Sequence, residues 1–319
     1  MAVVLTLGAV QIVEFTYRQD AARSQLLQAL EGNDPCFGAA AMADPSCPPT
    51  TKGPVLPAPA QAAVDKSEAY ADDCWESSPF AGTRECVFGD PNGSVSIALV
   101  GNSHAGQWLG PIDAIARSKG WKVTTFLASM CTATSIDLQW TSAEGRDGCR
   151  QWGRNVLEAT TTGEFDLVLT AERNSFAAAG KSLSESEPVW EKGYSDYLRS
   201  WLASDVNVAV IQDSPLPAKD IQSIPDCVAE HMDDLEQCAG DAGTWIPDDP
   251  LVRAATKLQD ERVSVIDLNA SFCTTTCPAV IGGVVVYFDG SHITNTYAMT
   301  LAPYLVGPLG AAVQGATAN

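Results

Sequence analysis

Short apolar runs alternate with amphipathic segments from residue 94 to residue 269. Five of these runs have the length of a strand, at 94–101, 121–128, 165–171, 207–213 and 262–269. Uninterrupted apolar runs of this kind are typical of strands that are buried on both faces. Between them, apolar residues recur at helical spacing in four segments, at 106–120, 148–163, 186–204 and 250–260. The alternation predicts an α/β fold, a three-layer α/β/α sandwich around a mainly parallel five-stranded sheet.

The last part of the chain carries one further apolar run and one further helical pattern. Residues 282–289 have the character of a strand. Apolar positions at helical spacing follow at Ile293, Tyr297, Leu301 and Leu305. This order predicts that Asp289 and His292 lie on the turn that opens the final helix.

Two upstream segments lack this rhythm. Residues 35–92 are rich in Pro, Ala and Gly without a sustained period, which predicts a disulfide-pinned linker with neither helix nor strand. Residues 1–13 are almost wholly apolar, but they lack a basic n-region and a small-residue cleavage site, so they make a poor signal peptide. They are also shorter than the roughly 20 residues that span a bilayer.

We therefore interpret residues 1–34 as the exit end of a membrane helix whose upstream part is missing, or as a short anchor, followed by a polar helix. An ordinary amphipathic helix is the alternative, but the apolar residues run all round rather than along one stripe. The chain then divides into the segment 1–34, the linker 35–92 and one α/β domain at 93–319. The N-terminal segment associates this domain with the membrane.

Charge and cysteine content narrow the class of protein. The formal net charge is −20 and no basic block occurs, which excludes nucleic acid as a partner. The ten cysteines form five close sequential couples, which predicts local disulfides and an extracytoplasmic setting. Pairing between neighbours is one of several possible connectivities. Thiolate metal sites are the alternative, but they require CxxC pairs or nearby histidines, and the chain has only three histidines. No metal is expected.

Candidate chemistry appears where the first strand ends. In parallel sheets the ligand crevice lies beyond the carboxyl ends of the strands, and Ser103 follows the first strand in "GNSHA". Ser103 is either a nucleophile or the cap of a helix. A nucleophilic serine needs a base, and His104 is its immediate neighbour and points elsewhere, while His231 lies among acids and is expected at the surface.

His292 is therefore the candidate base. Asp289 precedes it by one turn and can accept the imidazole Nδ1 proton, so that Nε2 faces outward. The alternative is that Asp289 or Ser291 only caps the final helix.

Together, "GNSHA" and the late Asp289-Gly-Ser-His292 resemble the SGNH hydrolase superfamily. The resemblance is strongest to SGNH domains that follow integral-membrane acyltransferase domains in bacterial cell-envelope O-acetyltransferases, and it covers roughly residues 93–308. It implies an SGNH or flavodoxin-like fold, with Ser103 as the nucleophile, His292 as the general base and Asp289 as the acid that orients it.

The same resemblance implies an oxyanion hole. Its donors are the backbone N–H of Ser103 and the side chain of Asn174, although an ordinary turn role for Asn174 is equally open. Asn102 stands where the commoner motif has aspartate, beside the nucleophile, and is a further candidate at this site. The loop "ASMCTATS" lacks the glycine that the family's second block usually provides. A missing donor costs about 2.7–4 kcal/mol in the barrier unless another group replaces it.

The function expected from the resemblance is O-acyl transfer, most simply of an acetyl group, through an acyl-enzyme at Ser103. The acceptor is a hydroxyl of an extracytoplasmic cell-envelope glycan or glycolipid, and a membrane acyltransferase domain delivers the acyl donor. No cofactor is implied. Two alternatives stay open: an extracytoplasmic carbohydrate or lipid esterase, and a catalytically silent glycan-binding domain.

Overall fold

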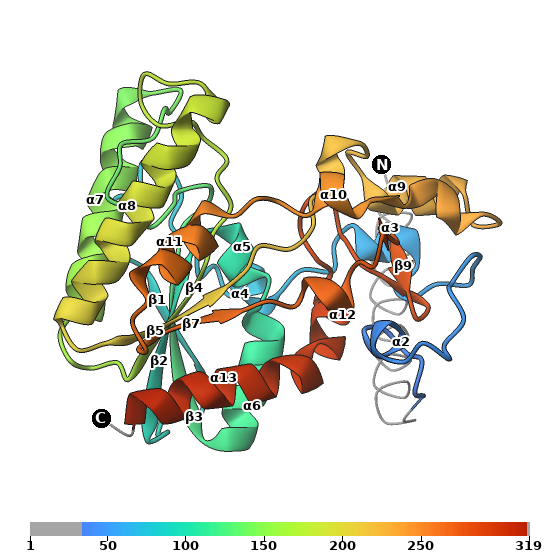
Figure 1. Ribbon diagram of the computed structural model, residues 1–319, viewed down its shortest axis with the longest axis horizontal. Coiled ribbons are helices and arrows are strands. Elements are labelled where there is room, and N and C mark those ends of the chain that lie inside the picture. Colours follow the sequence, from blue (N-terminus) through green and yellow to red (C-terminus); the bar gives the residue numbers. More distant parts are fainter. Residues whose placement is uncertain (1–33, 318–319) are drawn as a thin grey trace, which may run out of the picture.

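A central sheet of six strands forms the middle layer of the structure, a computed structural model that describes residues 34–317 (Figure 1). The strand order is β1-β3-β2-β4-β5-β7. The bounds are Glu85–Gly89 for β1, Val95–Gly101 for β2, Trp121–Leu127 for β3, Leu167–Ala171 for β4, Asn207–Ile211 for β5 and Val263–Ile266 for β7. Within this six-stranded sheet, β1 and β3 pair antiparallel and the other neighbouring strands pair parallel. The predicted mainly parallel sheet is confirmed, with β1 as an added edge strand.

Helices cover both faces of this sheet (Figure 1). One layer consists of α6 (Leu109–Lys119) and α13 (Ala302–Thr317), and the other of α7 (Ala143–Thr160), α8 (Leu183–Ala203) and α11 (Pro250–Leu258). Along β2, Ile97 and Leu99 belong to one buried cluster, whereas Ala98 and Val100 belong to the other. Successive side chains of a strand point to opposite faces, so both faces are buried. The predicted three-layer sandwich is confirmed.

Two helices begin upstream of their predicted starts because serine residues cap them. Ser142 accepts a hydrogen bond from the Gly145 N–H at the start of α7. Ser182 and Glu185 form a capping box at the start of α8. Side-chain capping satisfies N–H groups that the first helical turn leaves unpaired, and it therefore fixes where each helix begins.

The apolar run at 282–289 was predicted as one strand, and the structure corrects its extent. Only Val284–Val285 form a strand, β10, which pairs with β9 (Val280–Ile281). Gly282 and Gly283 have φ values of 54° and 76°, and two residues with positive φ reverse the chain in a tight hairpin. The helical pattern that follows is divided between α12 (Asn295–Thr300) and α13.

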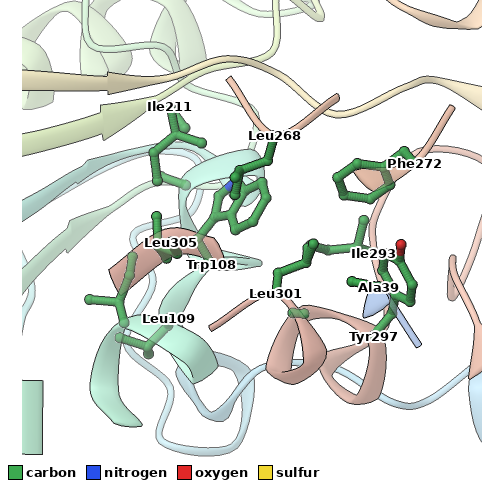
Figure 2. Packing of buried hydrophobic residues seen from close by; sticks show 14 of the residues in the cluster. Ala39, Trp108, Leu109, Ile211, Leu268, Phe272, Ile293, Tyr297, Leu301 and Leu305 are labelled. Carbon is green, nitrogen blue, oxygen red and sulfur yellow. The ribbon is translucent and has the colours of Figure 1, made fainter. Parts of the chain in front are cut away.

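The prediction that residues 35–92 contain neither helix nor strand was also wrong. This segment contains α2 (Ala40–Ala43), α3 (Pro59–Ala62), α4 (Glu68–Ala71) and β1. Ala39 and Ala62 are fully buried, and Figure 2 shows Ala39 beside Tyr297 and Ile293 of the core. Helices of one turn are too short to show a period, and contacts with distant residues stabilise them. The three-part division of the chain stays a prediction.

A lobe beside the sheet joins this upstream segment to later loops (Figure 1). Its short elements are α9 (Ile224–Glu230), α10 (Ala242–Trp245), β6 (Gly240–Asp241), β8 (Thr276–Cys277), β9 and β10, with 3₁₀ turns at Pro217–Lys219, Leu235–Cys238 and Asn269–Ser271. The buried cluster that α6 and α13 form on the sheet continues into this lobe, from Trp108 and Leu305 to Phe272 (Figure 2).

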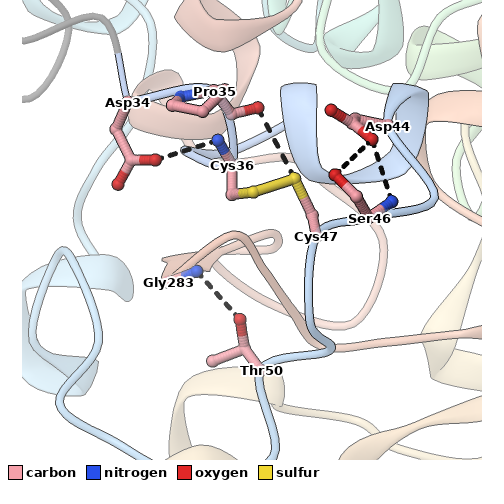
Figure 3. The surroundings of a disulfide bond; sticks show 8 residues. All are labelled: Asp34, Pro35, Cys36, Asp44, Ser46, Cys47, Thr50 and Gly283. Carbon is pink, nitrogen blue, oxygen red and sulfur yellow. Dashed lines mark hydrogen bonds between the residues drawn. A yellow bond between two sulfur atoms is a disulfide. The ribbon is translucent and has the colours of Figure 1, made fainter.

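Five disulfides join the sequential couples, which confirms local pairing. They are Cys36–Cys47, Cys74–Cys86, Cys131–Cys149, Cys227–Cys238 and Cys273–Cys277. Figure 3 shows the first of them, followed by Thr50, whose hydroxyl accepts a hydrogen bond from the Gly283 N–H at 3.0 Å. Disulfides and hydrogen bonds between residues distant in the sequence thus hold the lobe together.

The membrane-helix stub and polar helix were predicted for residues 1–34, and residues 1–33 lie outside the described part of the chain. Between residues 34 and 317, no helix is both long enough and apolar enough to cross a membrane.

Candidate active site

The turn after β2 sets the position of Ser103. Strand β2 ends at Gly101, where a Cβ atom would lie 2.3 Å from the Ala171 carbonyl oxygen, so only glycine fits. The short helix α5 (Ser103–Gly106) then begins at Ser103 itself. Its cap is Asn102, whose Oδ1 accepts a hydrogen bond from the His104 N–H at 3.0 Å. The capping role considered for Ser103 therefore belongs to its neighbour.

The structure brings the three predicted catalytic residues together. Ser103 Oγ lies 2.8 Å from His292 Nε2, and His292 Nδ1 lies 2.8 Å from Asp289 Oδ2. The two ring nitrogens of His292 thus face a hydroxyl and a carboxylate. In this geometry the imidazole can remove the proton of the serine, while the carboxylate holds the ring in the tautomer that does so.

The loop that carries Asp289 and His292 is held by its own backbone. Asp289 Oδ1 accepts hydrogen bonds from the N–H groups of Ser291 at 2.7 Å and His292 at 2.8 Å. Neither Asp289 nor Ser291 caps the following helix, because Thr294 does so by accepting from the Tyr297 N–H. One carboxylate therefore shapes the loop and orients the histidine.

The surroundings of Asp289 favour its ionised form. Burial opposes ionisation, but the hydrogen bond and charge of His292, with the N–H groups of His292 and Ser291, outweigh it and lower the pKa of Asp289 to about 2. The carboxylate is therefore charged at neutral pH and able to stabilise an imidazolium at His292.

Residues from the upstream segment complete one wall of the site. The Phe288 ring stacks on the His292 ring with 5.1 Å between centroids and 3° between planes. Lys66 Nζ lies 5.1 Å from the Phe288 centroid and 5.2 Å from that of Tyr70. A Cβ atom on Gly106 would lie 2.2 Å from the Trp75 ring, so this ring packs directly on α5. This wall was not predicted, because residues 35–92 were expected to form a linker.

The predicted oxyanion donors differ in their surroundings. Ser103 is the first residue of α5, so its N–H has no partner within the helix. Asn174 accepts a hydrogen bond from the Tyr194 hydroxyl at 2.6 Å, which leaves its amide N–H groups as donors. Asn102 is buried, and its amide is occupied: Oδ1 accepts from His104, and Nδ2 donates to the Arg173 carbonyl at 2.8 Å. Asn102 thus holds the turn in place.

A cavity of about 490 Å³ lies beyond the carboxyl ends of β4 and β5. Arg173 and Asn174 line it, and the Arg173 guanidinium makes no hydrogen bond or ion pair with any residue between 34 and 317. Glu172, Asp213 and Asp249 line the same cavity and are buried. The positions of Glu172 and Arg173 at this edge of the sheet could have been predicted, because both residues directly follow a predicted strand.

Burial disfavours the charged form of these acids. It raises the pKa of Glu172 well above its usual range and that of Asp213 to about 7. Burial, followed by the charge of Asp213, raises the pKa of Asp249 to about 7. The cavity therefore carries less negative charge at neutral pH than its residue types suggest.

Other predicted features fall outside this site. His231 is half-buried at the end of α9, within the lobe. No group of three or more His, Cys, Asp or Glu residues in the described chain is arranged to hold a metal ion.

Comparisons with known proteins agree with this architecture. Residues 68–306 match the sequence family described as "SGNH domain (fused to AT3 domains)", a range that begins upstream of the expected residue 93. The fold is similar to the periplasmic domain of a lipopolysaccharide acetyltransferase of Salmonella ser. Paratyphi A, with 12% identity and a TM-score of 0.51 over 70% of this chain and 84% of that chain.

A protein assigned as an acylhydrolase, from Bacteroides fragilis NCTC 9343, aligns with 12% identity and a TM-score of 0.38 over 71% of this chain and 89% of that one. No curated protein sequence matches. The family match includes β1 to β7 and the loop of His292. The chain therefore belongs to the family of SGNH domains that are fused to AT3 acyltransferase domains.

Proposed function

We propose that the protein transfers an acyl group, most simply acetyl, to a hydroxyl of an extracytoplasmic glycan or glycolipid through an acyl-enzyme at Ser103. The observation that carries this proposal is the continuous line from Ser103 Oγ to His292 and Asp289, with 2.8 Å at each step. The family of the chain, SGNH domains that are fused to AT3 acyltransferase domains, also supports the proposal.

The first half of the reaction loads the serine. His292 Nε2 takes the Ser103 proton as Oγ attacks the carbonyl carbon of the donor, and the carbonyl oxygen becomes an oxyanion. When the tetrahedral intermediate collapses, the donor's leaving group accepts the proton from His292 and departs. Asp289 stays ionised throughout and stabilises the imidazolium.

The second half releases the acyl group. An acceptor hydroxyl gives its proton to His292 Nε2 and attacks the acyl carbon, and Ser103 Oγ leaves with the proton from the imidazolium. Transfer and hydrolysis differ only in whether a sugar hydroxyl or water attacks. Ser103 N–H and the Asn174 amide are the oxyanion donors in this proposal, since the Asn102 amide is occupied.

Three findings support the proposed location and the proposed acyl donor. Five disulfides and the likeness of the fold to a periplasmic domain support an extracytoplasmic site of action. Fusion to AT3 domains in the family supports delivery of the acyl group by a membrane acyltransferase. The cavity beside Arg173 is where we place the acceptor.

A transfer assay tests the proposal. The protein is incubated with a chromogenic acetyl ester and envelope glycans from a strain that lacks it, and the glycans are analysed by mass spectrometry. We expect an acetyl increment on the glycans, which Ser103→Ala and His292→Asn each abolish. Release of acetate without any acetylated glycan identifies an esterase instead, and turnover that survives Ser103→Ala overturns the serine mechanism.

A further inference from the structure

His104 follows the nucleophile directly, yet it takes no part in the line of proton transfer. Its side chain is fully buried, and Nδ1 lies 2.5 Å from Oδ1 of Asp213, which follows β5. Its Nε2 is also buried and has no hydrogen-bond partner among residues 34–317. A buried histidine with one nitrogen so tightly paired and the other unpartnered is costly, so its position calls for a reason.

The ring of His104 lies against the ring of His292. Their centroids are 4.7 Å apart with 45° between the planes. Phe288 stacks on the His292 ring as well, at 5.1 Å. The two nitrogen edges of His292 are occupied by Ser103 and Asp289, so each kind of contact available to the imidazole is already made by a defined neighbour.

Charges reach His292 from several elements. Asp289 lies on its own loop, Asp213 lies behind His104, and Arg173 lies after β4. From the upstream segment, the Lys66 ammonium lies over the Phe288 ring. Burial, followed by the charge of Asp289, raises the pKa of Tyr70 to about 12. Of the two carboxylates, Asp289 bonds the edge of the imidazole, whereas Asp213 bonds His104 and interacts with His292 through its charge alone.

We propose that His104 and Asp213 form a buried positioning pair, which holds the face of the His292 ring and stabilises the imidazolium that forms on His292 during acyl transfer. The pair rests on the proposed function, because it acts on the base of that reaction. No bond to His104 or Asp213 is made or broken.

The protonation state of His104 fits this role. Burial, followed by the positive charges of His292 and Arg173, keeps the pKa of His104 well below its ordinary value. The neutral ring can donate its Nδ1 proton to Asp213, and a carboxylate that accepts this proton makes the imidazole more electron-rich. An electron-rich ring face attracts a cation, here the imidazolium of His292.

Two substitutions distinguish the contribution of the Asp213 charge from that of the His104 ring. Asp213→Asn keeps an oxygen that accepts from His104 but removes the negative charge. His104→Asn keeps a donor near the position of Nδ1 but removes the ring. Asp113→Asn is the matched control, because Asp113 is buried and bonds the Gly89 N–H at 2.7 Å, but it belongs to α6 and contacts no residue of the site.

The readout is kcat and KM for a chromogenic acetyl ester from about pH 5 to about pH 8. For both site variants we expect kcat to fall about 10-fold with KM within about 2-fold, because an imidazolium appears only during turnover. The loss in Asp213→Asn should grow as the pH rises, since burial raises the pKa of Asp213 to about 7 and the wild-type charge develops as the pH passes through that value. Asp249 accepts from the Asp213 N–H and has a pKa of about 7 as well, so it ionises over the same range in both proteins.

A purely structural role gives a different result. In that case Asp213→Asn lowers activity by the same factor at every pH, or not at all, and the proposal is overturned. Fluorophosphonate labelling distinguishes this failure from failure of the proposed function. If Ser103 is labelled in the wild-type protein and in Asp113→Asn, the serine mechanism stands whatever the positioning pair does.

Nuclear magnetic resonance gives a second measurement that does not depend on turnover. The chain contains three histidines, so an imidazole ¹⁵N spectrum holds three patterns. At constant pH we expect Asp213→Asn to shift the ¹⁵N resonances of the His104 and His292 patterns, because the two rings are in contact, and to leave the His231 pattern unchanged. A His292 pattern that stays the same contradicts the pair.

Discussion

Asn102 and Arg173 are joined by two hydrogen bonds between the side chain of one and the backbone of the other. Asn102 Nδ2 donates to the Arg173 carbonyl at 2.8 Å, and Asn102 Oδ1 accepts from the Arg173 N–H at 3.3 Å. These two bonds, which we call the clamp, connect the turn after β2, where Ser103 lies, to the residues after β4 that line the cavity. An ionised aspartate cannot replace this amide, because a carboxylate accepts hydrogen bonds but does not donate them.

Asn102→Asp tests the clamp. Aspartate has no N–H to offer the Arg173 carbonyl, and it places a second carboxylate beside buried Glu172, which accepts from the Asn102 backbone N–H at 3.2 Å. We expect the free energy of unfolding to fall by about 1–3 kcal/mol. Urea denaturation measures it. Asn92→Asp, the same exchange at an exposed position, should change stability little.

Arg173→Gln tests the lining of the cavity. The guanidinium makes no hydrogen bond or ion pair with residues 34–317, and its charge acts on buried Asp213 and His104 only at a distance, so its removal should change the melting temperature little. If the cavity holds the acceptor, transfer to glycan should fall about 10-fold or more in kcat/KM. The control is Arg199→Gln on the exposed face of α8. Equal transfer by both variants would place the acceptor elsewhere.

The buried acids predict how stability depends on pH. Burial raises the pKa of Asp213 from 3.8 to about 7, so the folded state holds its proton more tightly than the unfolded state. The stability this contributes is complete below pH 3.8 and is lost as the pH rises through about 7. We expect Asp213→Asn to lose less stability than the wild-type protein between these limits, by on the order of 1–4 kcal/mol. Parallel curves from urea denaturation would contradict this assignment.

Because the cysteines are paired in disulfides, we predict that the protein has no free thiol that can be alkylated. All ten cysteines are paired within the described chain. Intact-mass measurement after alkylation of the unfolded, unreduced protein should therefore detect no added label, and alkylation after reduction should label all ten. Partial labelling without reduction would show that one couple is open.

The sequence was sufficient for the parts of the site that directly follow strands. Ser103 follows an apolar run that forms β2, and the ligand crevice of such sheets lies beyond the carboxyl ends of the strands. Asp289 and His292 were predicted from their spacing and from the family resemblance, and the strand expected directly before them does not form. The turn geometry could not be predicted. Both Asn102 and Ser103 are good caps, and only the backbone conformation decides that α5 begins after Asn102.

The positioning pair and the upstream wall could not be predicted for a different reason. Asp213 and His104 are 109 residues apart, and Lys66 reaches Phe288 from a segment whose one-turn helices show no period. Their proximity comes from packing between distant segments rather than from local preference. Residues 35–92 illustrate the same limit, because their order depends on partners such as Thr300, whose hydroxyl accepts from the Ala39 N–H at 3.0 Å.

The central claim is that Ser103 forms an acyl-enzyme, and mass spectrometry of the protein tests it most directly. The protein is mixed with a reactive acetyl ester, quenched in acid and digested. The account predicts one acetyl increment on the peptide that contains Ser103, and no increment on that peptide in Ser103→Ala. Acetylation at another residue with undiminished turnover in Ser103→Ala would contradict it.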